Sequence, residues 1–287
     1  MQLLTSVELQ QSLSHHPCLN EIEQWVHDFL AKPHPKLGRS GPVCPFLPHA
    51  LRSNTVHFGT IATEGRGVDE LTDLVKGYCD TFLELEPKTG RLAVYKSILL
   101  VFPDLTAEEA PDVVDVIQQR LKPLFVEQGL MIGEFHSRNE SPGLHNPNFR
   151  PLRSPIPMLA IRFMAASDLP FLSRSTDDPA VRLSYLQAYV KRMGQEPHAA
   201  RSLAYAQEAI AIAKAELGHG EAELGNNEVE LGNSPIGTEP VSKCPMRPIF
   251  NTFKAIAHQI KTVGRWAVGL AQWSLATASF IGMVGGR

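Results

Sequence analysis

Strand-like and helix-like apolar patterns alternate along residues 55–194, and this alternation constrains the fold more than any other feature of the chain. Residues 55–63 (TVHFGTIAT) mostly alternate between apolar and polar side chains, as in a half-buried strand. Residues 67–85 place apolar side chains on one face of a helix. The apolar half of residues 93–103 (AVYKSILLVFP) is continuous, which is typical of a strand covered on both faces. The pattern predicts one α/β domain.

Local end signals place the next elements of this domain. Thr106 and Glu109 are spaced as in a capping box and predict a helix over residues 106–127, which Gly129 ends. Towards the amino terminus, Asn20 is the expected cap of a further helix.

Two more strands and two helical segments complete the expected domain. The strands are expected at residues 130–135 and 157–164, and the helical segments open at Asp168 and at Asp177 and Asp178. The predicted fold is a single α/β sandwich domain with a mixed sheet, followed by a flexible linker and a helical tail. The expected divisions are residues 1–40 (helix and loop), 41–214 (α/β domain), 215–246 (linker) and 247–287 (tail).

Three seven-residue units, AELGHGE, AELGNNE and VELGNSP, follow each other over residues 215–235. A seven-residue period is usually a coiled-coil signal, but the glycine at a fixed place in every unit opposes a helix. We therefore interpret residues 215–246 as a low-complexity linker.

The tail carries an uncharged run over residues 267–284 after an apolar stripe that begins at Ile249. A membrane span needs about 20 apolar residues, and this run is shorter and diluted by polar side chains. Two interpretations remain open. Residues 249–284 form an interfacial membrane helix or marginal anchor, or they dock on the domain or on a partner protein.

Charge and cysteine usage exclude several classes of protein. The formal net charge of the 287 residues is −3, which argues against a dedicated nucleic-acid binder. The four cysteines lie far apart and form no C-x-x-C pair, so neither a zinc ribbon nor a disulfide framework is expected. The first residues lack the pattern of a secretory signal, and a cytoplasmic protein is the default expectation.

The segment GLHNPNFRPLRSPIPMLAIRFM, residues 143–164, gathers the candidate site residues. Arg150 and Arg153 lie in its proline-rich half, and guanidinium groups bind carboxylate or phosphate bidentately. Its prolines fix backbone torsions and would pre-organise these side chains. Arg162 lies inside an apolar strand, so its charge must be paired, with Asp168 or Glu134 as the expected partner. The segment predicts a site for a small anionic metabolite.

Two histidines, His136 at a strand end and His145 in the loop, are the candidate reacting groups. The chain has no Walker loop, no G-x-G-x-x-G and no G-x-S-x-G, which disfavours the familiar nucleotide enzymes and hydrolases. Haem needs one axial His or Cys, an apolar slot and cations for its propionates. His136 or His145 would be the iron ligand, with a preference for His136 because a strand end positions a side chain more rigidly.

The three arginines would hold the haem propionates, and a cysteine–proline pair adds a further candidate contact. Cys44 precedes a proline in PVCPF, a dipeptide that sometimes contacts haem through its thiolate. Its alternative interpretation is a small buried residue in a rigid loop.

A resemblance to a known family rests on the order of several short motifs. The chain carries CPF, then a strand ending VFP, a long helix, a strand ending in His, FRPLRSP and AIR-x-M-x-x-x-D-L-P-F-L. Over residues 40–175 the chain resembles an uncharacterised bacterial domain family associated with specialised-metabolite gene clusters. It is more distantly similar to YqcI/YcgG-type proteins, some of which are haem-dependent oxygenases acting on amino acids. The resemblance implies a haem-dependent oxidoreductase acting on a carboxylate-bearing metabolite, and it leaves the choice between His136 and His145 open.

The alternative function is a non-catalytic protein that binds a ligand or partner and is placed at a membrane by its C-terminal helix. Under either function, the expected partners are a small anionic metabolite and a second copy of the chain, without nucleic acid. A membrane contact is expected only under the membrane interpretation of residues 249–284.

Overall fold

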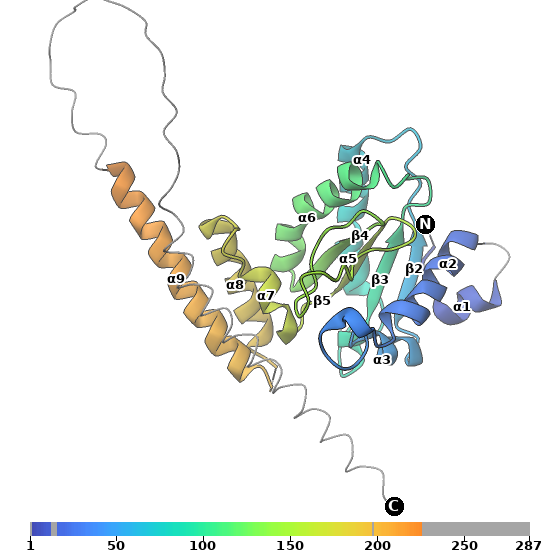
Figure 1. The fold of residues 1–287 in the computed structure, drawn as a ribbon, viewed down its shortest axis with the longest axis horizontal. Coiled ribbons are helices and arrows are strands. Elements are labelled where there is room, and N and C mark those ends of the chain that lie inside the picture. The colour runs from blue at the N-terminus through green and yellow to red at the C-terminus, as the bar shows by residue number, and fades with distance from the viewer. Residues whose placement is uncertain (1, 13–15, 197, 226–287) are drawn as a thin grey trace, which may run out of the picture. The chain divides into compact units, whose positions relative to one another are not determined.

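The computed structural model describes residues 2–12, 16–196 and 198–225. Within these residues, five strands form one mixed sheet with the order β1-β2-β3-β5-β4 (Figure 1). The strands are β1 (Leu4–Thr5), β2 (Val56–Thr60), β3 (Ser97–Val101), β4 (Leu130–Phe135) and β5 (Met158–Phe163). β2 and β3 are parallel, and the other neighbouring strands are antiparallel. The expected α/β fold with a mixed sheet is confirmed.

Helices cover both faces of this sheet, with α4 and α6 on one side and α1 to α3 on the other (Figure 1). The α-helices of the described residues are α1 (Ser6–Gln11), α2 (Pro17–Trp25), α3 (Leu47–Arg52), α4 (Val68–Lys76), α5 (Tyr78–Glu84), α6 (Val116–Glu127), α7 (Leu169–Leu172), α8 (Pro179–Met193) and α9 (Ala200–Gly225). Two π-helical turns, η1 (Val26–Leu30) and η4 (Pro111–Asp115), and three 3₁₀ turns, η2 (Pro35–Leu37), η3 (Ala93–Tyr95) and η5 (Ala166–Asp168), lie between them.

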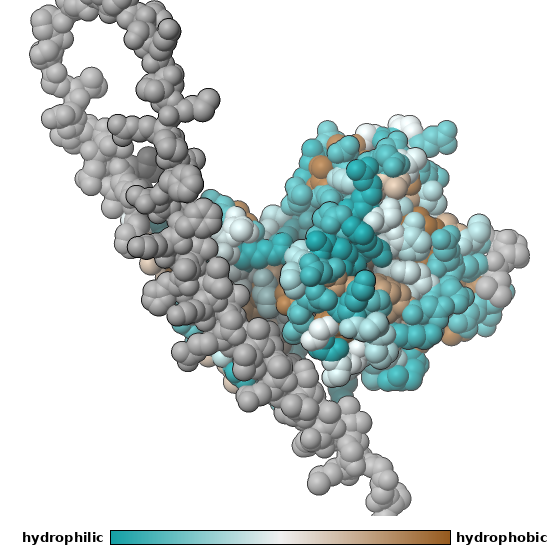
Figure 2. Space-filling view, viewed as in Figure 1, coloured by the Kyte–Doolittle hydropathy of each residue, from teal (hydrophilic) through white to brown (hydrophobic). Residues whose placement is uncertain are grey.

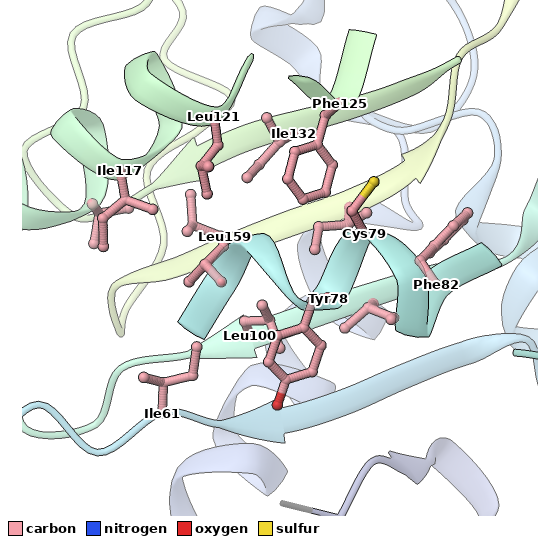
Figure 3. Packing of buried hydrophobic residues seen from close by; sticks show 14 of the residues in the cluster. Ile61, Tyr78, Cys79, Phe82, Leu100, Ile117, Leu121, Phe125, Ile132 and Leu159 are labelled. Atoms are coloured by element: carbon pink, nitrogen blue, oxygen red, sulfur yellow. The ribbon is translucent and has the colours of Figure 1, made fainter. Parts of the chain in front are cut away.

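The first apolar core lies between the sheet and the helices α4, α5 and α6 (Figure 3). The expected helix face over residues 67–85 is buried there, including Leu71, Val75 and Phe82, which are at most 2% exposed. This segment forms two helices rather than one, because the poor helix former Gly77 separates α4 from α5.

The second core lies on the opposite face of the sheet, under α2, η1 and α3. Its first helix begins at Pro17, so the expected cap at Asn20 is wrong. Proline is favoured in the first turn of a helix because its missing N–H has no partner there. The central strand β3 faces both cores, with Ile98 and Leu100 in the first and Leu99 and Val101 in the second. The expected double burial of this strand is confirmed.

The long helix that precedes β4 starts later than its capping box predicts. Thr106 and Glu109 make the reciprocal hydrogen bonds of a capping box, but the helical turns run from Pro111. Gly129 ends α6 as expected, with a φ of +73° that favours glycine. At the start of α8, the carboxylate of Asp178 accepts the N–H groups of the first turn, again as expected.

The helix α9 corrects the expected start of the linker at residue 215. It continues to Gly225, and its Glu216 forms an ion pair with Arg182 of α8. Alanine, glutamate, leucine and lysine around Gly218 are strong helix formers, and packing on α8 adds to their propensity. The rest of the expected linker and the whole tail, with its membrane interpretation, lie outside the described residues. Within the described residues, no helix is long and apolar enough to cross a membrane.

Candidate functional site

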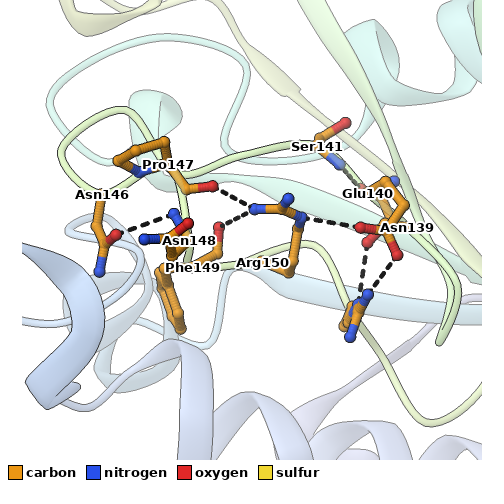
Figure 4. Close-up of polar contacts among 9 residues, drawn as sticks. Asn139, Glu140, Ser141, Asn146, Pro147, Asn148, Phe149 and Arg150 are labelled. Atoms are coloured by element: carbon orange, nitrogen blue, oxygen red, sulfur yellow. Dashed lines mark hydrogen bonds and ion pairs between the residues drawn. The ribbon is translucent and has the colours of Figure 1, made fainter.

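Arg150 and Arg153 share one carboxylate partner, Glu140, within the loop that follows β4 (Figure 4). The Nε of Arg150 lies 3.1 Å from Glu140, and Arg153 contacts the other oxygen of the same group. Arg150 also donates to the carbonyl of Pro147 at 2.5 Å, and Arg153 donates to the carbonyl of Asn139 at 3.1 Å. Hydrogen bonds from both arginines hold the pKa of Glu140 below its ordinary value. These two cations therefore link separate parts of the same loop and stabilise its conformation.

Arg162 is paired with a core carboxylate, as expected for a charge inside an apolar strand. Its two terminal nitrogens donate to the two oxygens of Asp168 at 2.7 and 2.6 Å. Asp168 is 1% exposed and also accepts the amide of Ala165. The guanidinium lies 5.4 Å from the ring centre of Phe46. Asp168, and not Glu134, is the partner of this arginine.

Cys44 and His145 both lie near another arginine, Arg39. Cys44 is half-buried and lies close enough to Arg39 and Arg162 to interact with both electrostatically. His145 lies on the surface of the loop. Surrounding protein atoms displace part of its water and, together with the charge of Arg39, lower its pKa. The candidate residues thus have different partners: Glu140 for Arg150 and Arg153, Asp168 for Arg162, and Arg39 for Cys44 and His145.

His136 forms a buried pair with an aspartate from a distant part of the chain. Its Nε2 lies 3.0 Å from Oδ1 of Asp115, and its side chain is 1% exposed. Its Nδ1 is buried and makes no hydrogen bond within the described residues. A carboxylate on Nε2 keeps the proton there, so Nδ1 of the neutral ring carries a free electron pair. The amide of His136 donates to the carbonyl of Leu152, which fixes the end of β4.

Helix and strand periodicity bring further ionisable groups to this pair. Asp115 ends the π-turn η4, and Lys122 follows two helical turns later on the same side of α6. Glu134 lies in β4 and His136 directly follows the end of this strand, so the alternation of side chains places both on the same side of the sheet. A hydrogen bond joins α6 to β4 beside these residues, because the side chain of Gln118 donates to the carbonyl of Ile132.

Two residues from the segment between α7 and α8 complete this group. Lys122 interacts electrostatically with Asp177, Arg174 and Glu134. We call this set the His136 cluster; its members are Asp115, Lys122, Glu134, His136, Arg174 and Asp177. π-helical turns such as the one that carries Asp115 occur frequently at functional sites.

Burial shifts several groups of the His136 cluster towards their neutral forms. It raises the pKa of Glu134, and the charge of Asp115 raises it further. Burial also raises the pKa of Asp115, against the opposing effect of His136. The pKa of Lys122 is lowered by burial and by Arg174. Carboxyl and amine groups shifted in opposite directions in one place are typical of functional sites.

Both cations of the His136 cluster keep donors available. The Nζ of Lys122 donates to the carbonyl of Phe171 at 3.3 Å and lies 4.8 Å from the ring centre of Tyr185. The guanidinium of Arg174 lies 5.7 Å from the ring centre of Phe171 and forms no ion pair within the described residues. The Oδ2 of Asp177 is buried and also makes no hydrogen bond there.

Of the His136 cluster, the sequence indicated only His136 as a reacting group. Lys122 could have been found from its spacing of seven from Asp115 on the expected helix, and Glu134 from its spacing of two from His136. Arg174 and Asp177 had no such signal, because only the packing of the segment between α7 and α8 brings them to this place.

The fold and this site define a mixed α/β domain with a buried histidine–aspartate pair at the end of an edge strand. Residues 19–203 match the model of a family described as Domain of unknown function (DUF6875). The chain belongs to this family, so the expectation of an uncharacterised domain family is confirmed. No curated protein and no solved structure matches the chain.

Proposed function

We propose that the domain is an enzyme that acts on a small anionic metabolite by general acid–base catalysis, with His136 as the base. The observation that carries this proposal is the unpartnered, buried Nδ1 of a ring whose Nε2 is held by Asp115. A histidine oriented by a carboxylate in this way can accept a proton at its free nitrogen. Asp115 also stabilises the imidazolium that results.

The two cations of the His136 cluster support an anionic substrate. Lys122 and Arg174 keep free donors, whereas Arg150, Arg153 and Arg162 are already paired with carboxylates. Ammonium and guanidinium groups together bind a carboxylate through charge-assisted hydrogen bonds. The anchor of the substrate is therefore expected at Lys122 and Arg174.

Glu134 is the proposed acid of the reaction. Its raised pKa favours the protonated carboxyl more than in an exposed glutamate, so it can return a proton to the substrate. Since the ring of His136 is 1% exposed, the substrate reaches it only when the following loop moves. The carbonyl of Leu152 in that loop is bonded to the amide of His136 and would be released.

The test is proton exchange in heavy water with a panel of small carboxylic acids, followed by NMR. The wild-type protein is expected to exchange or convert at least one of them. His136→Gln should lower this rate by about 10²- to 10⁴-fold, the usual contribution of a general base. His145→Gln, a matched change of an exposed histidine, should leave the rate unchanged. Full activity of the folded His136→Gln protein would refute the proposal.

A haem-dependent oxygenase is the second candidate, favoured by the same histidine–carboxylate pair. A metal-bound histidine commonly donates its other ring N–H to a carboxylate, and Asp115 lies at the right distance from Nε2 of His136 to accept such a bond. The resemblance to YqcI/YcgG-type proteins and to a family of specialised-metabolite clusters also supports it. The expected propionate partners do not fit, because Arg150 and Arg153 are bound to Glu140 and Arg162 to Asp168.

An absorbance spectrum after expression with a haem precursor separates the two candidates. A haem enzyme would show a Soret band that is lost in His136→Ala and kept in His145→Ala. A colourless wild-type protein that still exchanges substrate protons would exclude the haem candidate and leave the acid–base proposal standing.

A further inference from the structure

A hollow of about 340 Å³ lies between α3 and the turn η3. It is lined by His49, Arg91, Leu92 and Tyr95. Small-molecule sites are clefts of roughly 300–1,000 Å³, so the hollow is large enough for a small ligand. The helix α3 packs on the second core and α6 on the first. The hollow therefore lies on the opposite face of the sheet from the His136 cluster.

One wall of the hollow is a stacked pair of rings. The centres of the His49 and Tyr95 rings are 3.9 Å apart with an interplanar angle of 14°. The Oγ of Ser53 lies 3.0 Å from Nδ1 of His49 and fixes the orientation of the imidazole. Within the described residues, Nε2 of His49 and the hydroxyl of Tyr95 have no hydrogen-bond partner. The wall therefore offers a rigid aromatic surface with two polar groups at its edges.

A cation and an apolar side chain complete the lining. Among the described residues, the guanidinium of Arg91 has no carboxylate within ion-pair distance, unlike the arginines bound to Glu140 and Asp168. Leu92 is 44% exposed, although the visible surface of the domain is mostly hydrophilic (Figure 2). A small amphipathic anion would pair with this cation through its charged group and cover the apolar side chain with its apolar part.

We propose that this hollow binds a planar aromatic carboxylate. The carboxylate would pair with Arg91 through bidentate hydrogen bonds, and the ring would contact Leu92 and the His49–Tyr95 pair. A carboxylate oxygen can also accept hydrogen bonds from Nε2 of His49 or the hydroxyl of Tyr95. This site is separate from the His136 cluster and does not rest on the acid–base proposal.

The test is calorimetric titration of the full chain with benzoate, cyclohexanecarboxylate and benzyl alcohol. Benzoate should bind saturably, cyclohexanecarboxylate several-fold more weakly because it lacks the planar ring, and neutral benzyl alcohol at least tenfold more weakly. Arg91→Gln should weaken benzoate binding at least tenfold. His49→Ala should weaken it as well, with unfolding temperatures confirming that both variants fold.

Two controls distinguish this site from local charge and from the proposed catalytic site. Arg52→Gln removes an exposed cation of α3 that does not line the hollow, and it should leave benzoate binding unchanged. Lys122→Met tests the other carboxylate anchor of the domain: benzoate binding that is lost in this variant and kept in Arg91→Gln would place benzoate at the His136 cluster and overturn the proposal. The proposal is overturned if benzoate does not bind, or if its binding survives both Arg91→Gln and His49→Ala.

Discussion

Arginines of one short segment have different roles because their partners differ in burial. Arg162 pairs with Asp168, whose side chain is 2% exposed, whereas the side chain of Glu140, the partner of Arg150 and Arg153, is 70% exposed. A carboxylate that cannot return to water depends on its partner far more than an exposed one does. The sequence predicted a paired charge at Arg162 from its apolar neighbours. It could not predict the shared partner of the other two.

Arg162→Ala is therefore expected to destabilise the domain strongly. The change leaves the buried Asp168 without its cation, and breaking a buried pair costs about 3–5 kcal/mol. Urea unfolding followed by circular dichroism measures this loss. Arg153→Ala is the matched control and should unfold at nearly the wild-type midpoint, because Glu140 stays hydrated. Equal midpoints for the two variants would contradict this assignment.

Among the described residues, Lys96 is the most deeply buried cation. Lys96 is 0% exposed, and its Nζ donates a hydrogen bond to the carbonyl of Leu85 at 2.5 Å. The same nitrogen lies 4.6 Å from the ring centre of Phe82 and 5.3 Å from that of Phe163. Burial lowers the pKa of this amine from 10.5 to about 8.

This shift predicts that stability rises with pH. Between pH 8 and 10.5 the unfolded chain keeps the proton on Lys96 while the folded chain has lost it. Because the unfolded state binds more protons, the free energy of unfolding increases with pH over this window. Urea unfolding at pH 7, 8, 9 and 10 should show a larger increase for the wild type than for Lys96→Met. Parallel pH profiles would show that Lys96 does not titrate in this range.

At the scale of elements, the edge strand β4 is protected by side chains and a loop instead of a further strand. Gln118 bonds the carbonyl of Ile132, Asn139 bonds that of Glu134 at 3.4 Å, and Leu152 accepts the amide of His136. Covered edges of this kind prevent strand pairing between molecules. The first of these contacts also joins β4 to α6, the helix that carries Lys122.

The turn from α6 into β4 depends on the left-handed conformation of Gly129. A Cβ added there would lie 3.0 Å from Cδ of Arg192, at a φ of +73°. Gly129→Ala should cost about 1–2 kcal/mol, the penalty of the left-handed region for other residues. Thermal unfolding compares it with Gly133→Ala in β4. There the nearest atom to the new Cβ, of Phe135, is 3.6 Å away, so little change is expected. Similar losses for both would contradict a conformational cause.

The apolar periodicity predicted the strands β2 to β5 closely, because alternation and continuous burial are local properties. The helix starts were less predictable. Proline at residues 17 and 111 determined the first helical turn, whereas Asn20 and Thr106 carried the expected signal. The short strand β1 was not predicted, since its two residues are too few for a periodic pattern.

At the scale of the whole molecule, the order of the strands determines where the candidate site lies. β5 is inserted between β3 and β4, so β4 is placed at the sheet edge although it precedes β5 in the chain. This order exposes the end of β4 to α6 and to the segment between α7 and α8. No local pattern contains the strand order, which is why Arg174 and Asp177 could not be predicted as neighbours of His136.

The most direct test of this account is the position of the ring proton of His136. Long-range ¹H–¹⁵N NMR of the histidine-labelled protein at neutral pH distinguishes protonated from unprotonated ring nitrogens. The account predicts a proton on Nε2, facing Asp115, and an unprotonated Nδ1, and it predicts that Asp115→Asn disturbs this tautomer. A proton on Nδ1 of His136 in the wild-type protein would contradict its role as the base.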